Sequence, residues 1–390
     1  MNGSSVSGTI PSLFPELTRA NPDRFRTGIL PSQIIRELIA AGHISSANVI
    51  EPEQIQPSSI DLRLGSVAYR IRASFLPGDH STVARKLADH KLHEIDLTRP
   101  AVLEKGCVYI VPLQEELNLP SQISGKVNPK SSTGRLDIFT RVITDYGRQF
   151  EFVPSGYRGK LYAEVVPRTF SVLVRAGARL SQLRLSRGAP QFSDAELTRL
   201  DEREMLVYHE GERPAEAQIA GGLRLSVDLQ GVGGSDIIGY RAKQHSALID
   251  LDRIAYYEPN DFWDTIYRTK NRDLVLDPED FYILASKEKV RIPPGYAAEM
   301  VPYDPSVGEF RIHYAGFFDP GFGYGTDDIK GTRAVLEVRS HEVPFLLEDG
   351  QEVGSLTFER LIAIPDRLYG QDIGSNYQRQ GLQLSKHFRP

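Results

Sequence analysis

The segment PKSSTGR, at positions 129–135, contains residue types that bind phosphate groups. Its small residues let backbone N–H groups approach an anion, and Ser131 and Ser132 add hydroxyl donors. Lys130 and Arg135 add cations that can form charge-assisted hydrogen bonds. Because the same composition is typical of a solvated turn, two interpretations stay open: a phosphate-binding loop and an exposed turn.

Two glutamates lie in strand-like, partly apolar segments. In VPSGYRGKLYAEVV, a turn leads into a strand whose alternation places Glu164 on the same face as Tyr162 and Val166. In TRAVLEVRS, Glu337 lies between two apolar residues. A carboxyl group that is buried among such neighbours has a raised pKa, which suits a proton shuttle near neutral pH. The alternative for either glutamate is an ion pair with an arginine on an edge strand.

Two further segments contain polar groups that could contact a ligand. HYAGFFDPGFG contains Asp319 in a predicted tight turn. GSNYQRQG, at positions 374–381, contains Tyr377 and Gln380, whose side chains can stack on a ligand and hydrogen-bond to it. This tail either closes over a ligand or is a disordered terminus. In both cases we expect that removing the chain from Ser375 onward leaves the fold intact.

The elements that must position these residues are predicted to be mainly short strands. Between positions 58 and 185, the segments IDLRLG, VAYRIRA, CVYIVPL, YAEVV and FSVLVRA alternate with turns rich in Gly, Pro, Asn and Asp. Short strands without long helices between them indicate a barrel or a jelly roll. One helix is predicted over 31–44, with Pro31 in its first turn and Gly42 as its stop.

An internal repeat predicts a tandem duplication. Tyr109 and Tyr282 are 173 residues apart, and so are Glu164 and Glu337. We therefore expect a mainly β protein with two similar domains and a few short helices. The expected parts are an amino-terminal arm (1–27), a first domain (28–188), a linker (189–220) and a second domain (221–390). A capping box formed by Ser193 and Glu196 predicts a helix in the linker.

The composition excludes several classes of partner and site. The net charge of −5 argues against a nucleic-acid polymer, because phosphate backbones select basic faces. The single cysteine, Cys107, excludes disulfides within the chain and argues against Cys-rich metal sites. Neither a signal peptide nor a membrane-spanning segment is predicted, so we expect a cytoplasmic protein without a membrane partner.

SSIDLRLG at 58–65, KSSTGR, and SGYRG followed by a strand glutamate together resemble the dCTP deaminase branch of the dUTPase family. The resemblance covers nearly the whole chain, once per half. It implies two dUTPase-like domains, each a distorted jelly roll or β-barrel. It also implies a small-molecule deoxypyrimidine triphosphate as partner, magnesium on that triphosphate only, and a homo-oligomer with trimer-like rings and sites between subunits.

The resemblance also assigns roles to residues. In the family, a Ser-Ser-x-x-x-Arg loop binds phosphates, a strand glutamate shuttles protons, an aspartate contacts the sugar, and a Tyr-x-x-Gln tail closes over the nucleotide. The expected catalytic residues are Glu337, Glu164, Ser131 and Arg135. The expected substrate-binding residues are Lys130, Ser132, Ala315, Asp319, Val335, Leu336, Tyr377 and Gln380.

The two halves depart from the family pattern at complementary points. The first half has Pro154 where the family has its aspartate, and it lacks the tail motif. The second half has YDPSVGEFR in place of the phosphate loop. We therefore hypothesise a composite site, with phosphates on the first half and the pyrimidine and sugar on the second, served by Glu337. The alternative is homotypic rings that pair first halves with first halves, in which Glu164 is the working residue.

The implied reaction is hydrolytic deamination of dCTP to dUTP and ammonia. Zinc deaminases use His-x-Glu and Pro-Cys-x-x-Cys motifs, and this sequence has neither, so we expect no zinc and a metal-free glutamate as the proton carrier. Two alternatives stay open. One is dUTP pyrophosphatase activity, alone or combined with deamination, and the other is a non-catalytic nucleotide sensor.

Overall fold

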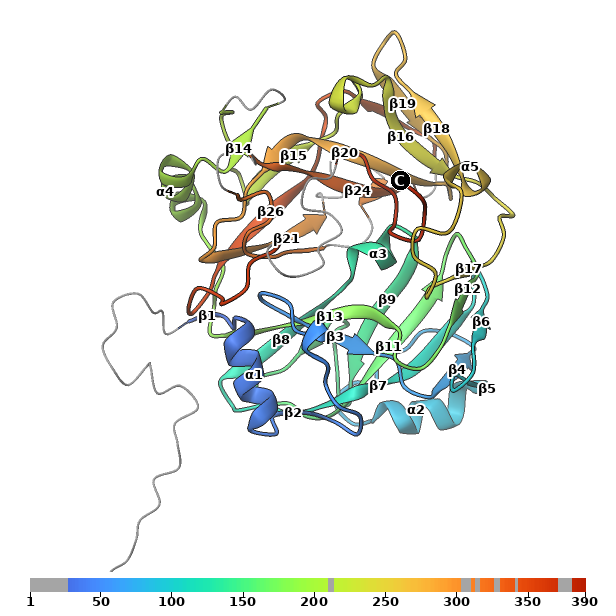
Figure 1. Cartoon of the computed structure of the whole chain (residues 1–390). Helices are drawn as coiled ribbons and strands as arrows, with labels where there is room; N and C mark the ends of the chain where they lie inside the picture. The colour runs from blue at the N-terminus through green and yellow to red at the C-terminus, as the bar shows by residue number, and fades with distance from the viewer. Residues whose placement is uncertain are drawn as a thin grey trace, which may run out of the picture.

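The computed structural model describes residues 27–209, 214–302, 310–312, 316–325, 330–340, 343–370 and 381–390. Three expected site residues, Ala315, Tyr377 and Gln380, lie outside the described residues, as does nearly all of the predicted arm. Figure 1 shows the first half of the chain, in blue to green, below the second half, in yellow to red.

The first half contains two main sheets and part of a third. One sheet has the order β1-β13-β8-β10, with β3 also paired to β13. The other has the order β5-β4-β7-β11-β9, with β2 also paired to β7. The third joins β6 and β12 of this half to β17 of the second half. The bounds are β1 Gly28–Ile29, β2 Ile44–Ser46, β3 Ile60–Arg63, β4 Val67–Ile71, β5 Lys91–Asp96, β6 Ala101–Leu103, β7 Val108–Asn118, β8 Ile123–Pro129, β9 Ile138–Thr144, β10 Phe152–Val153, β11 Arg158–Pro167, β12 Val172–Val174, β13 Arg179–Arg187 and β17 Ile249–Asp250.

The second half repeats most of this arrangement. One sheet has the order β18-β16-β20-β24-β22, with β14 also paired to β20, and the other has the order β15-β26-β21-β23. A separate pair joins β19 to β25. The bounds are β14 Val207–Tyr208, β15 Leu223–Ser226, β16 Ile237–Ala242, β18 Trp263–Tyr267, β19 Asp273–Leu276, β20 Phe281–Val290, β21 Tyr296–Pro302, β22 Phe310–Ile312, β23 Phe317–Phe318, β24 Thr332–Ser340, β25 Phe345–Glu348 and β26 Glu352–Arg360.

The repeated topology confirms the predicted duplication. β8 and β21, and likewise β13 and β26, begin and end at positions that keep the sequence offset of 173. Equivalent residues also meet where the halves pack together. Lys126 of β8 and Glu299 of β21 are related by that offset, and Lys126 Nζ lies 2.6 Å from Glu299 Oε2. The two halves therefore face each other through equivalent strands.

The described helices are short. They are α1 Ser32–Ala40, α2 Val83–His90, α3 Ser131–Gly134, α4 Asp194–Glu204 and α5 Pro259–Phe262, with 3-10 turns at Pro52–Gln54 and Val232–Gly234. α1 confirms the helix predicted before the strands, and the positive φ of 73° at Gly42 follows its end. α4 confirms the helix predicted after Ser193, including the capping box. In the described ranges we find no helix with both the length and the apolar character to cross a bilayer.

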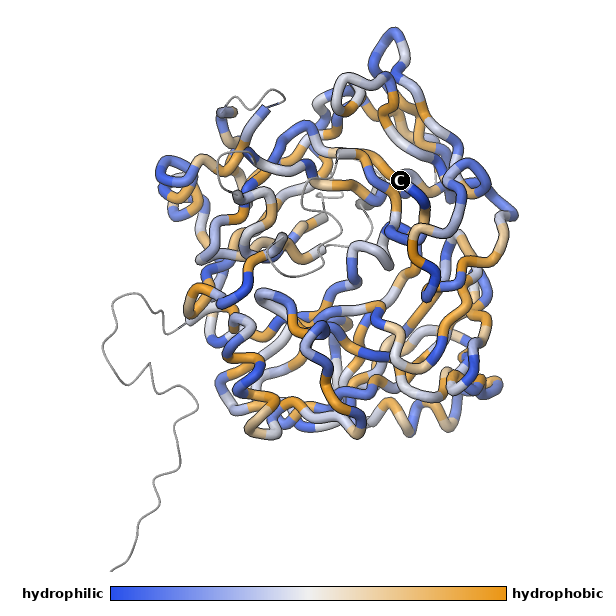
Figure 2. The backbone as a smooth tube through the Cα atoms, in the orientation of Figure 1, coloured by the Kyte–Doolittle hydropathy of each residue, from blue (hydrophilic) through white to orange (hydrophobic). Residues whose placement is uncertain are grey.

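The hydrophobic core is shared between the halves. Apolar residues are interspersed with polar ones along the strands of both (Figure 2). The larger cluster of buried residues contains the first-half core together with Trp263 and Phe281 of the second half and Leu384 and Phe388 near the end of the sequence.

The expectation that the chain can be cut at Ser375 without loss of the fold is wrong, because the removed segment includes part of this core. Phe388 is only 4% exposed, so its removal would open a cavity in the core.

One buried arginine connects the two halves. The guanidinium of Arg184, in β13, donates to the second-half carbonyl oxygens of Ala298 and Phe318 over 3.0 and 3.3 Å. It also pairs with the carboxylates of Asp319 at 3.4 Å and Glu359 at 3.3 Å. Burial raises the pKa of both carboxyl groups, although the charge of Arg184 opposes this. This contact fixes how the first half meets the second.

We predict that Arg184→Met lowers the free energy of unfolding by about 3–5 kcal/mol, because it leaves buried carboxyl groups without their cation. Denaturant unfolding near neutral pH measures the loss. Arg241→Met is the matched control, because Arg241 pairs with Asp264 at 3.5 Å on the surface, where such pairs contribute less than about 1 kcal/mol. Equal losses in the two variants would contradict a joining role for Arg184.

Candidate active site

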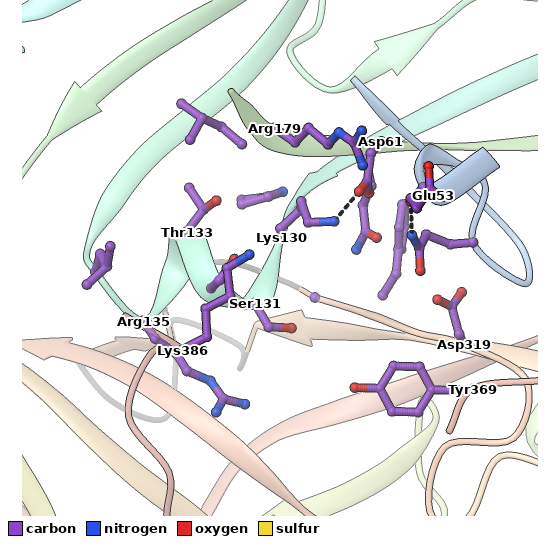
Figure 3. Close-up of a pocket in the computed structure, with 18 of the residues that line it drawn as sticks. Glu53, Asp61, Lys130, Ser131, Thr133, Arg135, Arg179, Asp319, Tyr369 and Lys386 are labelled. Carbon is purple, nitrogen blue, oxygen red and sulfur yellow. Dashed lines mark hydrogen bonds and ion pairs between the residues drawn. The ribbon is translucent and has the colours of Figure 1, made fainter. Parts of the chain in front are cut away.

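A cavity of about 1000 Å³ lies between the two halves. Its lining comes from α3 and its flanks, from the start of β13, from β24 and from the turn after β23. In Figure 3, Lys130, Arg135, Arg179 and Lys386 gather on one side, and Asp319 and Tyr369 lie on the other. The cavity thus has a cationic end, formed by the first half together with Lys386 of the second, and a mixed polar and aromatic end formed by the second half.

The cationic end is built around the predicted phosphate loop. SSTG folds as the short helix α3, and the N–H groups of Thr133 and Gly134 donate to Lys130 O over 2.8 and 3.0 Å. Lys130 forms an ion pair with Asp61 of β3. Ser131, Ser132 and Arg135 all line the cavity. Of the two interpretations left open by the sequence, the structure therefore favours a loop that faces a binding site over an exposed turn.

Glu337 of β24 lies directly against this loop. A Cβ atom added to Gly134 would be 2.4 Å from Glu337 Oε2, so the glutamate carboxylate occupies the space that a side chain at 134 would need. Glu337 is only 6% exposed. Burial raises its pKa well above the usual value for glutamate, while the positive charge of Arg135 lowers it and the negative charge of Asp137 raises it further. The cavity thus contains a buried carboxyl group whose pKa is shifted in the direction that suits proton transfer.

Glu164, the equivalent residue of the first half, is in a different environment. It lies directly opposite Arg141 in the β9–β11 pair, and Arg141 Nη2 is 2.5 Å from Glu164 Oε1. The guanidinium of Arg141 also packs over Phe150, 3.4 Å from the ring centre. Glu164 is not among the residues that line the cavity. Its surroundings match the structural ion pair that the sequence left as an alternative.

The remaining second-half residues divide between the cavity and the core. Asp319 lines the cavity and accepts a 2.5 Å hydrogen bond from Ser58 Oγ, in addition to its contact with Arg184. Val335 also lines the cavity. Strand alternation turns Leu336 to the other face of β24, into the second-half core. Any contact of Leu336 with a ligand would therefore involve its backbone.

Sequence reasoning did not identify several residues of the cavity. Asp61 belongs to the quoted SSIDLRLG motif, but nothing in the motif showed that it faces Lys130. Arg179 opens β13, and Lys386 lies in the segment after the tail motif. No helix or strand period in the sequence marks these residues as neighbours. They come together only when the two halves and the end of the sequence pack against each other. A search for cations beside predicted turns could have found Arg179 alone.

The fold and the cavity define a class: a duplicated, mainly β protein with a large cavity that has a cationic end between its two halves. Residues 26–189 match the family model for the N-terminal domain of 2'-deoxycytidine 5'-triphosphate deaminase, and residues 193–388 match the model for its C-terminal domain. The chain therefore belongs to the 2'-deoxycytidine 5'-triphosphate deaminase family. The second match begins at α4, which we predicted to be part of a linker.

Individual relatives agree with this assignment. The crystal structure of 2'-deoxycytidine 5'-triphosphate deaminase from Agrobacterium tumefaciens is similar to this chain with a TM-score of 0.82 and 52% identity, over 88% of this chain and 100% of that one. The dCTP deaminase of Natronomonas pharaonis is 32% identical over 33% of this chain and 64% of its own length. The dUMP-forming dCTP deaminase of Methanoculleus marisnigri is 30% identical over 48% of this chain and 99% of its own. The matched region therefore covers less than two thirds of the length of the Natronomonas protein. It covers 56% of the length of the dUMP-forming dCTP deaminase of Halobacterium salinarum.

We predict that Gly134→Ala lowers the free energy of unfolding by about 1–3 kcal/mol, since the new methyl group must displace the Glu337 carboxylate. Gly295→Ala is the matched control, because a Cβ atom there would meet nothing within 4 Å. The same Gly134→Ala change should be tolerated in a Glu337→Ala background, where the space is vacated. A loss that persists in that background would show that Glu337 does not contact position 134.

Proposed function

We propose that this protein hydrolyses the amino group of dCTP in the cavity between its halves, forming dUTP and ammonia, with Glu337 as the proton carrier. The observation that carries the proposal is the position of the Glu337 carboxyl group: it is buried, its pKa is raised, and it lies against the phosphate loop of the other half. Family membership and the similarity to the Agrobacterium enzyme support the same reaction.

In the proposed mechanism, the Glu337 carboxylate takes a proton from a water molecule that attacks C4 of the cytosine ring. The protonated carboxyl group then delivers this proton to N3. A second transfer moves the remaining hydroxyl proton to the amino group as the C4–N bond breaks and the carbonyl forms, so that ammonia leaves. The charge of Arg135 favours the carboxylate and burial favours the acid, which supports a group that cycles between both forms.

The first half binds the triphosphate in this proposal. Ser131 and Ser132 offer hydroxyl donors, and Lys130 and Arg135 offer cations. Asp319, Val335 and the undescribed Ala315, Tyr377 and Gln380 would contact the sugar and base, as the resemblance implies.

Magnesium would be bound chiefly by the phosphate oxygens and would neutralise their charge. Asp61 fits such an ion, because its Oδ1 is buried at the cationic end and accepts no hydrogen bond from the described residues. A water molecule of hydrated magnesium could donate to it. Among the described residues there is no group of three or more His, Cys, Asp or Glu side chains arranged to hold a metal ion.

A dUMP-forming reaction is the second candidate, because relatives such as the Methanoculleus protein are named for it. It would require a water molecule activated at the phosphates. Asp319 is held by Ser58 and Arg184, which argues against it as that base. Incubation with dCTP and dUTP separates the candidates: ammonia alone indicates a deaminase, pyrophosphate indicates a dUTPase activity, and binding without turnover indicates a sensor.

We further propose that the protein forms homo-oligomers with ring-like contacts in the cytoplasm, as the family resemblance implies.

We predict that Glu337→Gln lowers turnover of dCTP by about 10²–10⁴-fold while nucleotide still binds, because glutamine cannot carry the proton. The variant should be at least as stable as the parent above neutral pH. The folded protein binds a proton at Glu337 at pH values where the unfolded chain, with a pKa of about 4.3, does not. The parent therefore loses stability as pH rises through that window, and glutamine, which does not titrate, removes this loss.

Glu164→Gln is the matched control and should behave in the opposite way. It weakens the pairing with Arg141 and should lower the free energy of unfolding by about 1.5–3 kcal/mol, with a mild effect on turnover. Ammonia release and denaturant unfolding at two pH values measure both effects. If Glu164→Gln is the variant that loses turnover, homotypic rings with a first-half site are favoured. If neither variant loses ammonia release, the proposed mechanism is wrong.

We predict that mixing Arg135→Ala chains with Glu337→Gln chains restores no activity, even after joint unfolding and refolding. In the proposed site both residues belong to one chain, so no mixed assembly contains an intact site. A site shared between two chains would instead combine the intact Arg135 of one variant with the intact Glu337 of the other. Recovery of about a quarter of the parental rate would therefore contradict a site within one chain.

A further inference from the structure

The last ten residues of the sequence, Gly381–Pro390, return to the cavity and cover the phosphate loop. Arg135 Nη1 donates to Gln383 O over 2.9 Å. Ser385 Oγ donates to Ser132 O over 2.8 Å. Both contacts join this segment to the loop that sequence analysis identified as phosphate-binding, although the segment follows the predicted Tyr-x-x-Gln motif and belongs to none of the motifs.

The same segment is anchored in the second half. The side chain of Phe388 packs edge-on against Phe262 and Trp263, with ring centres 5.4 and 5.9 Å apart. The backbone N–H of Ala255 donates to Lys386 O over 2.9 Å. The segment is thus held on both sides of Lys386, by the phosphate loop before it and by the aromatic cluster after it.

His387 adds a further anchor without adding charge. Its ring is 3% exposed. Nε2–H donates to Leu251 O over 3.1 Å, and Nδ1, 2.9 Å from Ser385 Oγ, competes with Ser132 O for the hydroxyl proton. Burial, followed by the charge of Lys386, lowers its pKa to about 4, so the ring is neutral at physiological pH. The pair of Ser385 and His387 therefore fixes the backbone that carries Lys386.

Lys386 lines the cavity beside the other cations. Burial lowers its pKa, and the nearby charges of Lys130 and Arg179 lower it further, whereas Asp61 raises it. Figure 3 labels Lys386 on the same side of the pocket as Lys130, Arg135 and Arg179. Lys130, Arg135, Arg179 and Lys386 thus line one end of the cavity, where Asp61 pairs with Lys130 and Glu337 lies near Arg135. Such a concentration of cations in a chain with a net charge of −5 favours a polyanionic ligand.

We propose that Lys386 is a triphosphate-binding residue of this cavity, with Ser385 and His387 as the residues that position it. The ligand class is the charged phosphate chain of a nucleoside triphosphate. The inference deepens the proposed function and rests on it for the identity of the base, but not for the binding of the phosphates. It assigns a binding role to a segment outside the motifs that the family resemblance supplied.

The test uses inorganic triphosphate, which reports on the phosphate site without the base. We expect Lys386→Gln to raise the dissociation constant measured by calorimetry by about tenfold or more, the usual effect of losing one charge-assisted contact. Lys386→Arg should restore most of the affinity. The exposed Lys91, which pairs with Glu94 on an edge strand, supplies the control Lys91→Gln, with no expected change. Unchanged affinity in Lys386→Gln would overturn the proposal.

The positioning role has its own readout. Ser385→Ala should raise the KM for dCTP several-fold with little change in kcat, and it should weaken triphosphate binding much less in a Lys386→Gln background. Additive losses in this double-mutant cycle would mean that Ser385 acts only on general stability and would overturn its positioning role.

The two proposals fail in different ways. If Lys386→Gln weakens triphosphate binding but the parent protein releases no ammonia from dCTP, Lys386 keeps its role and the deaminase function is wrong. If the parent releases ammonia and Lys386→Gln binds triphosphate normally, the function stands and Lys386 has no part in it.

Discussion

Arg184 lies in the first half, but most of its hydrogen-bond acceptors belong to the second. A guanidinium has five N–H donors in a rigid, planar arrangement. Several buried acceptors can therefore receive hydrogen bonds from it only when the two halves lie in one of a few relative positions. One of these acceptors, Asp319, also lines the cavity. The interaction that joins the halves therefore also holds a residue of the cavity wall.

The duplication produced two copies of one strand glutamate, Glu164 and Glu337. The packing of the two halves places these carboxyl groups in different electrostatic environments. Glu164 pairs with a guanidinium that is directly opposite in the sheet. Glu337 faces a glycine and a cavity, where burial dominates its pKa. Since each half also lacks motifs that the other retains, the duplicated protein needs both halves for one proposed site.

Much of the fold was predictable because it depends on local patterns. Alternation and turn residues identified the strands, Pro31 and Gly42 bounded α1, and Ser193 with Glu196 marked the start of α4. The constant offset predicted the repeated topology. The end of the sequence was judged wrongly, because LSKHFRP has no strand or helix period. Phe388 is buried by Phe262 and Trp263, which lie more than a hundred positions earlier, and no local pattern records such a contact.

The sequence by itself determined the two-domain β architecture, the family resemblance and the residue types of the phosphate loop, because these follow from periodicity, repeats and short motifs. It favoured Glu337 over Glu164 only through the complementary loss of motifs in the two halves, because the two strand segments that contain them are alike. Tertiary structure gave the two glutamates different surroundings, by placing Arg141 beside Glu164 and Gly134 beside Glu337. It also brought Arg179 and Lys386 to the same cavity. The charge, burial and partners of a side chain depend on which distant segments surround it, and only the packed chain defines them.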